Sequence, residues 1–164
     1  MNGRQITPIE LQAERFAPFG DVLEIIGPCD FVFNGGMADR WHAQAFPSAH
    51  DGQVAISLAR ALPRQLPLGL EMVERHPMGS QAFMPLSNQP FLVIVSADQD
   101  GRPARPTVFL TNGRQGVNYR AGTWHGVLTP LGTIQDFLIV DRVGPSENLE
   151  EHFFEEPWEI VASD

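Results

Sequence analysis

The chain has 164 residues, of which 43% are hydrophobic and 19% charged, and this length and composition predict one globular domain spanning residues 1–164. Its 11 basic and 20 acidic residues give a formal net charge of −9, which argues against nucleic acids and anionic membranes as partners, because both are bound through clustered cations. Cys29 is the only cysteine and the N-terminus lacks an apolar signal core, so we expect a cytoplasmic protein without an intrachain disulfide.

Short strands separated by turns are predicted along most of the chain. The 15 glycines and 14 prolines are spread through the sequence, which suits many strands and turns better than long helices. A short helix is predicted at residues 11–16. Strands are predicted at residues 21–25, 31–33, 54–58, 68–74, 81–86, 91–96, 107–110 and 134–141. The pattern favours an all-β barrel or jelly-roll with one or two short helices, closed so that no strand edge stays free.

A carboxylate and an imidazole are predicted to share one face of a strand. Successive side chains of a strand point to opposite faces, so Glu74 and His76 project the same way. After a Met-Gly-Ser turn, Gln81 can return on the neighbouring strand to the same region. Such polar groups are costly to bury unless they bind something or take part in chemistry.

A second polar segment follows a glycine turn and ends in Trp124 and His125. Together with Glu74, His76 and Gln81, the imidazole of His125 would complete a set of nitrogen and oxygen ligands that suits a divalent metal. A metal-free role for Glu74 and His76 in acid–base chemistry is an equal alternative, because histidine titrates near neutral pH. Structural uses are a third alternative, in which Glu74 pairs with Arg75 or Arg120 and His76 is a turn residue.

Other polar and aromatic residues are weaker candidates for contacts with a ligand. Arg40 and His42 flank Trp41 in a predicted strand, and an arginine there could clamp a carboxylate through two parallel hydrogen bonds. Trp124 could form an apolar wall over a ligand. Asn118 and Tyr119 offer an amide and a hydroxyl.

Two further segments are predicted to have structural uses. Arg142 follows Asp141 at the end of a strand, and an internal salt bridge is the expected use of this arginine. The acidic tail at residues 147–159 carries interleaved aromatic side chains, which we expect to pack on the barrel or on a partner subunit.

Several motifs in the same order along most of the chain resemble the ureidoglycolate lyase family, once called ureidoglycolate hydrolases, of the cupin superfamily. The motifs that carry the resemblance are Phe16-Ala17-Pro18-Phe19-Gly20-Asp21-Val22, Glu74-Arg75-His76-Pro77, Gly79-Ser80-Gln81-Ala82-Phe83, Thr111-Asn112-Gly113, Gln115-Gly116-Val117-Asn118-Tyr119, Trp124-His125 and Asp136-Phe137-Leu138-Ile139-Val140-Asp141-Arg142. The resemblance implies a cupin barrel, a homodimer, and cleavage of (S)-ureidoglycolate to glyoxylate and urea in allantoin degradation. It also implies a divalent metal, with nickel the one expected.

Site residues are carried over onto the matching positions. The resemblance implies catalytic roles for Glu74, His76 and His125, with Glu74 or His76 as the base and His125 as the acid or a polarising contact. If a metal is bound, these three and Gln81 take the places of the four cupin ligands. The expected substrate contacts are Arg40, His42, Gln81, Asn118, Tyr119 and Trp124, with Arg40 as first candidate for the substrate carboxylate, and Arg120 or a bound metal as the second.

The chain departs from the family pattern at two positions. Family members typically read Asn-Tyr-His and Trp-His-His-Pro here, where this chain has Arg120 and Gly126 in place of an imidazole. Two alternatives to a lyase therefore stay open: a non-catalytic cupin that binds a small acid, and a cupin metalloenzyme of other chemistry.

Overall fold

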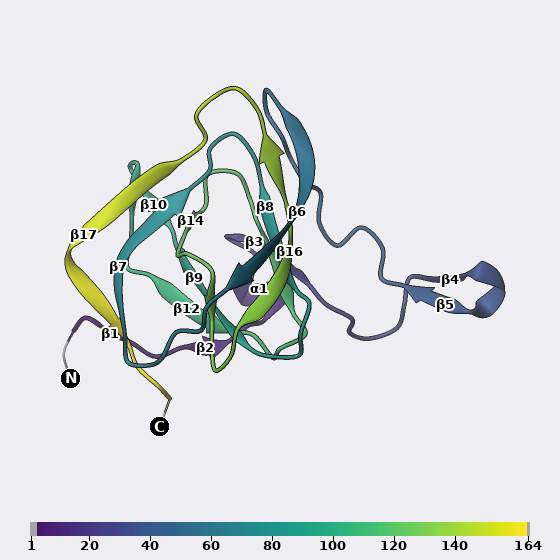
Figure 1. Cartoon of the computed structure of the whole chain (residues 1–164), viewed down its shortest axis with the longest axis horizontal. Coiled ribbons are helices and arrows are strands. Elements are labelled where there is room, and N and C mark those ends of the chain that lie inside the picture. The colour runs from purple at the N-terminus through teal and green to yellow at the C-terminus, as the bar shows by residue number, and fades with distance from the viewer. Residues whose placement is uncertain (1–2, 164) are drawn as a thin grey trace.

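Short strands make up most of residues 3–163, the part of the chain that the computed structural model describes (Figure 1). Within this part there is one short α-helix, α1 (Ala13–Phe16), and one 3-10 turn, η1 (Asn34–Gly36). The prediction of an all-β fold with one or two short helices is confirmed. No helix among these residues is long and apolar enough to span a membrane.

The larger sheet has eight strands and curls around one side of the molecule. Its strand order is β1 (Gln5–Ile6), β17 (Glu150–Ile160), β7 (Leu68–Arg75), β14 (Trp124–His125), β9 (Phe91–Ser96), β12 (Thr107–Leu110) and β2 (Ile9–Glu10), with β15 (Thr129–Pro130) also paired to β9.

The smaller sheet has five strands and faces the larger one. Its order is β3 (Gly20–Leu23), β13 (Gly116–Tyr119), β8 (Gln81–Pro85), β16 (Gln135–Val143) and β6 (Gln53–Ala61). Two small hairpins complete the fold, namely β4 (Phe31–Phe33) with β5 (Ala38–Arg40), and β10 (Asp98–Gln99) with β11 (Arg102–Pro103). The fold is an all-β, cupin-like curled sheet.

The core lies between the two sheets. Val93 and Val95 of β9 are fully buried and cluster with Phe83, Val117 and Phe137 of the five-stranded sheet. The alternate residues of β9 belong to a second buried cluster on the other face of the eight-stranded sheet. Strand β9 is therefore buried on both faces, which explains why it reads as a continuous apolar run.

Most predicted strands coincide with strands of the structure. The strands predicted at residues 31–33, 91–96 and 107–110 have the observed bounds of β4, β9 and β12. No strand was predicted in the acidic tail, but most of the tail forms β17, which pairs antiparallel with β7. Two of its aromatic side chains, Phe154 and Trp158, pack on the barrel as expected, whereas Phe153 is 64% exposed.

One long segment belongs to neither of the two sheets. The arm, which we define as residues 24–52, joins β3 at one edge of the five-stranded sheet to β6 at the other edge. Its β4–β5 hairpin projects away from the barrel (Figure 1).

Candidate active site

Three side chains converge at one end of the barrel and form the triad of Glu74, His76 and His125. One possible ligand atom from each lies within 4.8 Å of the others. The pairing of β7 with β14 explains this, because Glu74 is the direct register partner of His125, so the two side chains share a face. His76 follows the end of β7, and its imidazole lies 5.2 Å from that of His125, measured between ring centroids. The structure thus brings together three of the four residues that the sequence singled out as possible metal ligands.

Both imidazoles of the triad have one nitrogen held by a backbone carbonyl. Nδ1 of His76 lies 2.7 Å from the carbonyl oxygen of Asn148, and Nδ1 of His125 lies 3.0 Å from that of Gly126. Because a carbonyl oxygen only accepts, each Nδ1 carries the proton in the neutral ring, which leaves Nε2 with a free lone pair. Both Nε2 atoms are buried and have no hydrogen-bond partner among residues 3–163.

The charges within the triad follow from burial and proximity. Burial lowers the pKa of His125 to about 4, so this imidazole is neutral at physiological pH. Burial also acts to lower the pKa of His76, but Glu74 and the Asn148 carbonyl outweigh it and raise that pKa. Contact with His76 lowers the pKa of Glu74. Since Nε2 of His76 and Oε1 of Glu74 are 3.7 Å apart, we describe them as an ion pair rather than a hydrogen bond.

A row of three polar side chains on the opposite sheet faces the triad. Tyr119, Gln81 and Asp141 are direct register partners across β13, β8 and β16. They share the face of the sheet that carries the core residues. The ring of Tyr119 stacks on that of His125, with 4.3 Å between centroids and 4° between planes. The expectation that Gln81 returns on a strand next to β7 is wrong, because β8 belongs to the facing sheet.

A cavity of about 320 Å³, here called the mouth cavity, opens beside the triad and this row. Its lining residues are His76, Ser80, Gln81, Asp141, Arg142, Asn148 and Leu149. Asp141 is a site residue that the sequence did not single out. The signal was available, since Asp141 follows Phe137 and Ile139 at intervals of two along one strand and therefore shares their inward face.

Arg142 fixes the loops around this cavity. It is 8% exposed and donates hydrogen bonds to the backbone carbonyls of His50, Asp51 and Ser146. The expected internal salt bridge of Arg142 is wrong for the described residues 3–163, because its guanidinium bonds to backbone carbonyls instead. Gly79 packs against this arginine so closely that a Cβ at position 79 would lie 2.8 Å from that of Arg142.

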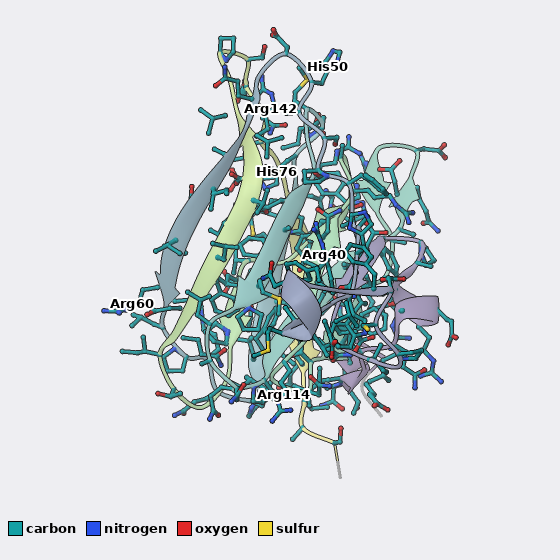
Figure 2. All side chains as sticks on the ribbon, turned by 90° about the vertical axis from the view of Figure 1, so that its right-hand side faces the viewer. Arg40, His50, Arg60, His76, Arg114 and Arg142 are labelled. Carbon is teal, nitrogen blue, oxygen red and sulfur yellow. The ribbon has the colours of Figure 1, made fainter. Side chains whose placement is uncertain are left out.

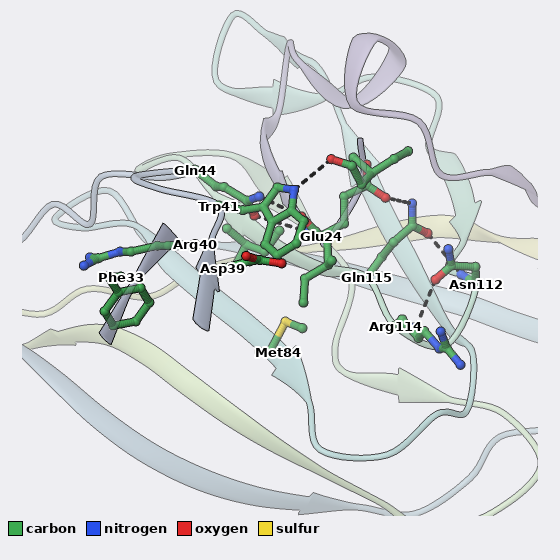
Figure 3. A pocket seen from close by; sticks show the side chains of 13 residues that line it. Glu24, Phe33, Asp39, Arg40, Trp41, Gln44, Met84, Asn112, Arg114 and Gln115 are labelled. Atoms are coloured by element: carbon green, nitrogen blue, oxygen red, sulfur yellow. Dashed lines mark hydrogen bonds between the residues drawn. The ribbon is translucent and has the colours of Figure 1, made fainter. Parts of the chain in front are cut away.

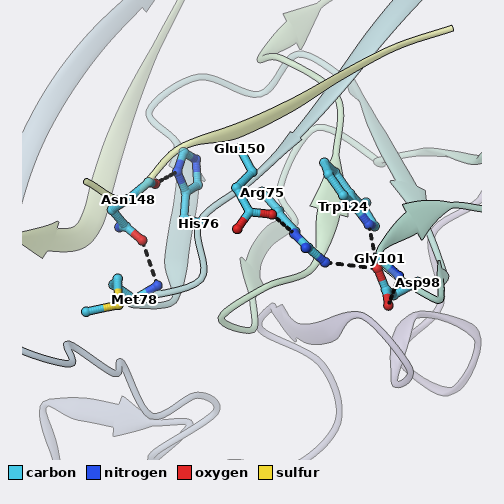
Figure 4. A network of polar contacts seen from close by, with 8 residues as sticks. All are labelled: Arg75, His76, Met78, Asp98, Gly101, Trp124, Asn148 and Glu150. Carbon is cyan, nitrogen blue, oxygen red and sulfur yellow. Dashed lines mark hydrogen bonds and ion pairs between the residues drawn. The ribbon is translucent and has the colours of Figure 1, made fainter. Parts of the chain in front are cut away.

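Within residues 3–163, the carboxylate of Glu74 forms no ion pair with an arginine. Arg75 instead forms ion pairs with Asp98 and Glu150, at 2.9 and 2.6 Å (Figure 4). Its guanidinium also lies 4.3 Å from the centroid of the Trp124 ring. The alternative in which Glu74 is neutralised by Arg75 is thus not observed.

Trp124 and Asn118 lie on faces that point away from the triad. Trp124 precedes His125 on β14, so it belongs to the second buried cluster and donates a hydrogen bond to Asp98 (Figure 4). Asn118 precedes Tyr119 on β13, and its amide nitrogen donates to Asp21 at 3.1 Å. The structure does not bring either side chain to the cavity, because each precedes an inward-facing residue on its strand and points to the opposite face.

Arg40 and His42 lie on the arm. Arg40 ends β5 and lies over the ring of Phe31 at 5.6 Å, whereas the backbone N–H of His42 donates to Asp30. Figure 2 shows His76 and Arg142 toward one end of the molecule, with Arg40 on the projecting segment. The structure does not bring Arg40 and His42 to the triad.

Arg40 lines a different hollow, here called the arm pocket, which has a volume of about 840 Å³ and lies between the arm and the five-stranded sheet (Figure 3). Trp41 and Gln44 come from the arm, and Met84 and Gln115 from the sheet side. Trp41 donates a hydrogen bond from its indole to the carbonyl of Ile26, 2.9 Å away. No residue of the triad lines this pocket.

The two departures from the family pattern lie off the inward face. The guanidinium of Arg120 is 3.8 Å from Asp21, which pairs with the outward Asn118. A Cβ at Gly126 would lie 2.9 Å from that of Ile94, a member of the second cluster. An imidazole at either position would not join the triad without rearrangement.

The triad fits a divalent metal. It offers two imidazole nitrogens and a carboxylate oxygen from one small volume, and the two buried Nε2 atoms have no other partner among the described residues. Three protein ligands with a position left for solvent or substrate are typical of catalytic metal sites. The carbonyls that hold each Nδ1 would orient the ligating nitrogens.

Comparison with known proteins agrees with the sequence motifs. Residues 3–161 match the family model described as ureidoglycolate lyase. A protein from Chelativorans sp. (strain BNC1) is 54% identical over 159 residues, and one from Mesorhizobium japonicum is 52% identical over 158 residues. The alignments cover 96% of both chains in the first case, and 95% of this chain and 97% of the relative in the second. Both relatives are named ureidoglycolate lyase.

Among solved structures, a dTDP sugar isomerase from Desulfovibrio desulfuricans G20 is similar over 85% of this chain and 87% of its own, at 14% identity and a TM-score of 0.47. The family model matches nearly the whole chain, and the two relatives are about 50% identical to it. These two findings decide the family. The chain belongs to the ureidoglycolate lyase family.

Proposed function

We propose that this protein is a ureidoglycolate lyase that cleaves (S)-ureidoglycolate to glyoxylate and urea, a step of allantoin degradation. The observation that carries the proposal is the triad of Glu74, His76 and His125 beside a cavity, in a chain that belongs to this family. The two relatives described above are named for the same activity.

The substrate sets the chemical requirements. Ureidoglycolate holds a carboxylate, a hydroxyl and a ureido nitrogen on one carbon. Its cleavage removes the hydroxyl proton, forms the carbonyl of glyoxylate, breaks the carbon–nitrogen bond and returns one proton to the nitrogen of urea. One base and one acid therefore suffice, and each positioned group contributes roughly 10²–10⁴-fold.

Glu74 and His76 can supply this pair. The lowered pKa of Glu74 and the raised pKa of His76 favour a carboxylate beside an imidazolium. Glu74 would take the hydroxyl proton and His76 would protonate the departing nitrogen. A proton transfer across the 3.7 Å between them would then restore the starting state. His125 as the acid is a weaker assignment, because burial keeps its imidazole neutral.

A divalent metal at the triad is the alternative use of the same residues. Glu74, His76 and His125 would hold it, and nickel is the ion to test first on the family resemblance. Such an ion would supply a positive charge that polarises the oxygens of the substrate. This charge would suit a site whose lining arginine, Arg142, is already bonded to backbone carbonyls.

A non-catalytic acid-binding cupin is less well supported. That alternative rested on the loss of two imidazoles, and the replaced positions face away from the triad. The acid–base pair proposed for the reaction, Glu74 and His76, is present.

We also propose that the protein is a cytoplasmic homodimer. Large apolar side chains are exposed on the outer face of the five-stranded sheet and on the arm, including Ile56 at 73% and Leu58 at 72%. Monomeric proteins rarely expose contiguous apolar patches of this kind. Light scattering is expected to report a dimer at micromolar concentration, and a monomer would contradict the proposal.

The activity is tested by product analysis. The purified protein is expected to release glyoxylate and urea in equal amounts from racemic ureidoglycolate, with at most half of the racemate consumed. Release of ammonia in place of urea would instead indicate hydrolysis of the ureido group. No release by the folded protein would contradict the lyase assignment.

A further inference from the structure

The pairing of Gln81 with Asp141 presents two hydrogen-bond acceptors beside the triad. Nε2 of Gln81 donates to Oδ2 of Asp141 at 3.1 Å. Since a carboxylate only accepts, the amide atom facing it must be nitrogen, which fixes the orientation of the Gln81 side chain. Its Oε1 therefore points the other way, where it is buried and has no hydrogen-bond partner among residues 3–163.

Asp141 also has one carboxylate oxygen, Oδ1, without a protein donor among the described residues. Oδ2 is engaged by Gln81, and no side chain or backbone group of the described residues donates to Oδ1. No arginine forms an ion pair with this carboxylate within residues 3–163, since the neighbouring Arg142 bonds to backbone carbonyls on the other side of the strand. Both Gln81 and Asp141 line the mouth cavity together with His76.

Two unsatisfied acceptors at a cavity wall call for a ligand that donates. Leaving the buried Oε1 of Gln81 unpaired costs free energy, and Oδ1 of Asp141 adds a charged acceptor in the same cavity wall. A ureido group carries N–H donors and ends in a planar NH₂ with two of them. The carboxylate of the substrate, by contrast, would be repelled by Asp141.

We propose that Gln81 and Asp141 recognise the ureido group of the substrate, with Oε1 of Gln81 and Oδ1 of Asp141 accepting its N–H donors. This inference deepens the proposed lyase function and rests on it. It gives the two sheets different tasks, because the eight-stranded sheet then carries Glu74 and His125 while the five-stranded sheet reads the leaving group.

Two ligands that differ from each other at one group test this recognition. Ureidoacetate keeps the carboxylate and the ureido group of the substrate but lacks the hydroxyl, so it cannot be cleaved. N-acetylglycine replaces only its terminal NH₂ by a methyl group. Calorimetric titration of both ligands therefore measures recognition of the NH₂ group without turnover, which separates this test from the assay of urea and glyoxylate release.

The unmutated protein is expected to bind ureidoacetate about 10-fold or more tightly than N-acetylglycine, because the methyl group leaves the acceptors unpaired. In Gln81→Met and Asp141→Asn this ratio is expected to fall to within about 3-fold, mainly through weaker binding of ureidoacetate. Asp136→Asn is the matched control. Asp136 lies on the same strand as Asp141 but pairs with Arg60 on the outer face, so its loss is expected to leave the ratio unchanged.

Three results would overturn the assignment. One is an unmutated protein that does not prefer ureidoacetate. Another is a ratio that stays above 10 in both folded variants, with circular dichroism confirming the fold. The third is an equal loss of affinity for both ligands, which would assign Gln81 and Asp141 to the carboxylate end or to the general shape of the cavity. In each case an unmutated protein that still releases urea and glyoxylate would leave the lyase function standing.

Discussion

The triad and the arm pocket both contain polar residues that could hold a small acid, but they are built differently. The triad residues lie on or next to paired strands of the barrel, and their positions follow from backbone pairing, as the register of Glu74 with His125 shows. The residues of the arm pocket lie largely on a projecting segment, where Arg40 and His42 are exposed. The arm pocket is larger than the mouth cavity beside the triad, but it is not the better candidate for catalysis.

The contrast teaches that acid–base chemistry needs partners held in fixed geometry. His76 is bonded to Asn148, and Asn148 in turn accepts a hydrogen bond from the backbone N–H of Met78 at 2.6 Å (Figure 4). The guanidinium of Arg40 lies over the ring of Phe31, at the distance of a weak cation–π interaction. Variants in the two regions are accordingly expected to differ in the size of their effects.

The largest effect is expected at the centre of the triad. His76→Ala should lower kcat about 10²–10⁴-fold, because it removes either a proton donor or a metal ligand. Glyoxylate and urea release measures the loss, and circular dichroism checks the fold. A folded variant with near-normal turnover would exclude the triad as the reaction centre.

A pH-dependent loss of stability is expected from His125. Its pKa is near 4 in the folded protein and near 6.5 in the unfolded chain, so only the unfolded state gains a proton between these values. The free energy of unfolding should therefore fall on the order of 3 kcal/mol from pH 6.5 to 4 through this residue. Chemical unfolding with a chelator present measures this slope, and His125→Gln should flatten it.

The other triad residues also contribute to the pH profile. The raised pKa of His76 stabilises the fold fully below pH 6.5, and this contribution is lost as the pH rises through its folded value. The lowered pKa of Glu74 gives a contribution that is present above its unfolded value and lost on acidification through the folded one. An identical slope in His125→Gln and the unmutated protein would contradict a neutral, buried His125.

A moderate effect is expected where the loop holds His76. Asn148→Ala removes the acceptor for the Met78 N–H and loosens the carbonyl that orients Nδ1 of His76. Losses of about 10-fold in kcat are typical when the partner of a site histidine is disturbed. Asn148→Asp keeps an acceptor oxygen and should retain more activity than Asn148→Ala. Equal activity of all three proteins would show that the loop does not position His76.

The smallest effect is expected on the arm. Arg40→Ala should change kcat and KM by less than about 2-fold, because the structure keeps Arg40 away from the triad. Steady-state kinetics decide this point. A large rise in KM with unchanged kcat would mean that Arg40 grips the substrate carboxylate after all.

The sequence pattern predicted the positions of residues best on long, regular strands. The alternation along residues 68–74 predicted a polar strand face with Glu74, which is the register partner of His125, and residues 91–96 were predicted as the strand that β9 forms. The same alternation, applied to β16, would have found Asp141. Asn118 and Trp124 each precede an inward residue on their strands, and they point away from the triad because neighbours on a strand face opposite ways.

Long-range pairing and loop contacts could not be predicted. Nothing local to Gln81 indicates that β8 joins the five-stranded sheet, because sheet order is decided by contacts distant in sequence. The Arg142 side chain bonds to the carbonyls of His50 and Asp51, some ninety positions away. The arm likewise contains a short strand pattern at Phe31–Phe33 that was predicted correctly, but its projection from the barrel depends on the whole fold.

The most direct test of the account is the position of a bound, uncleavable ligand. A crystal structure of the protein with ureidoacetate is expected to show the ligand in the mouth cavity, with its ureido group at Gln81 and Asp141 and its central carbon facing Glu74 and His76. Electron density for the ligand in the arm pocket beside Arg40, with the mouth cavity empty, would contradict the central claim.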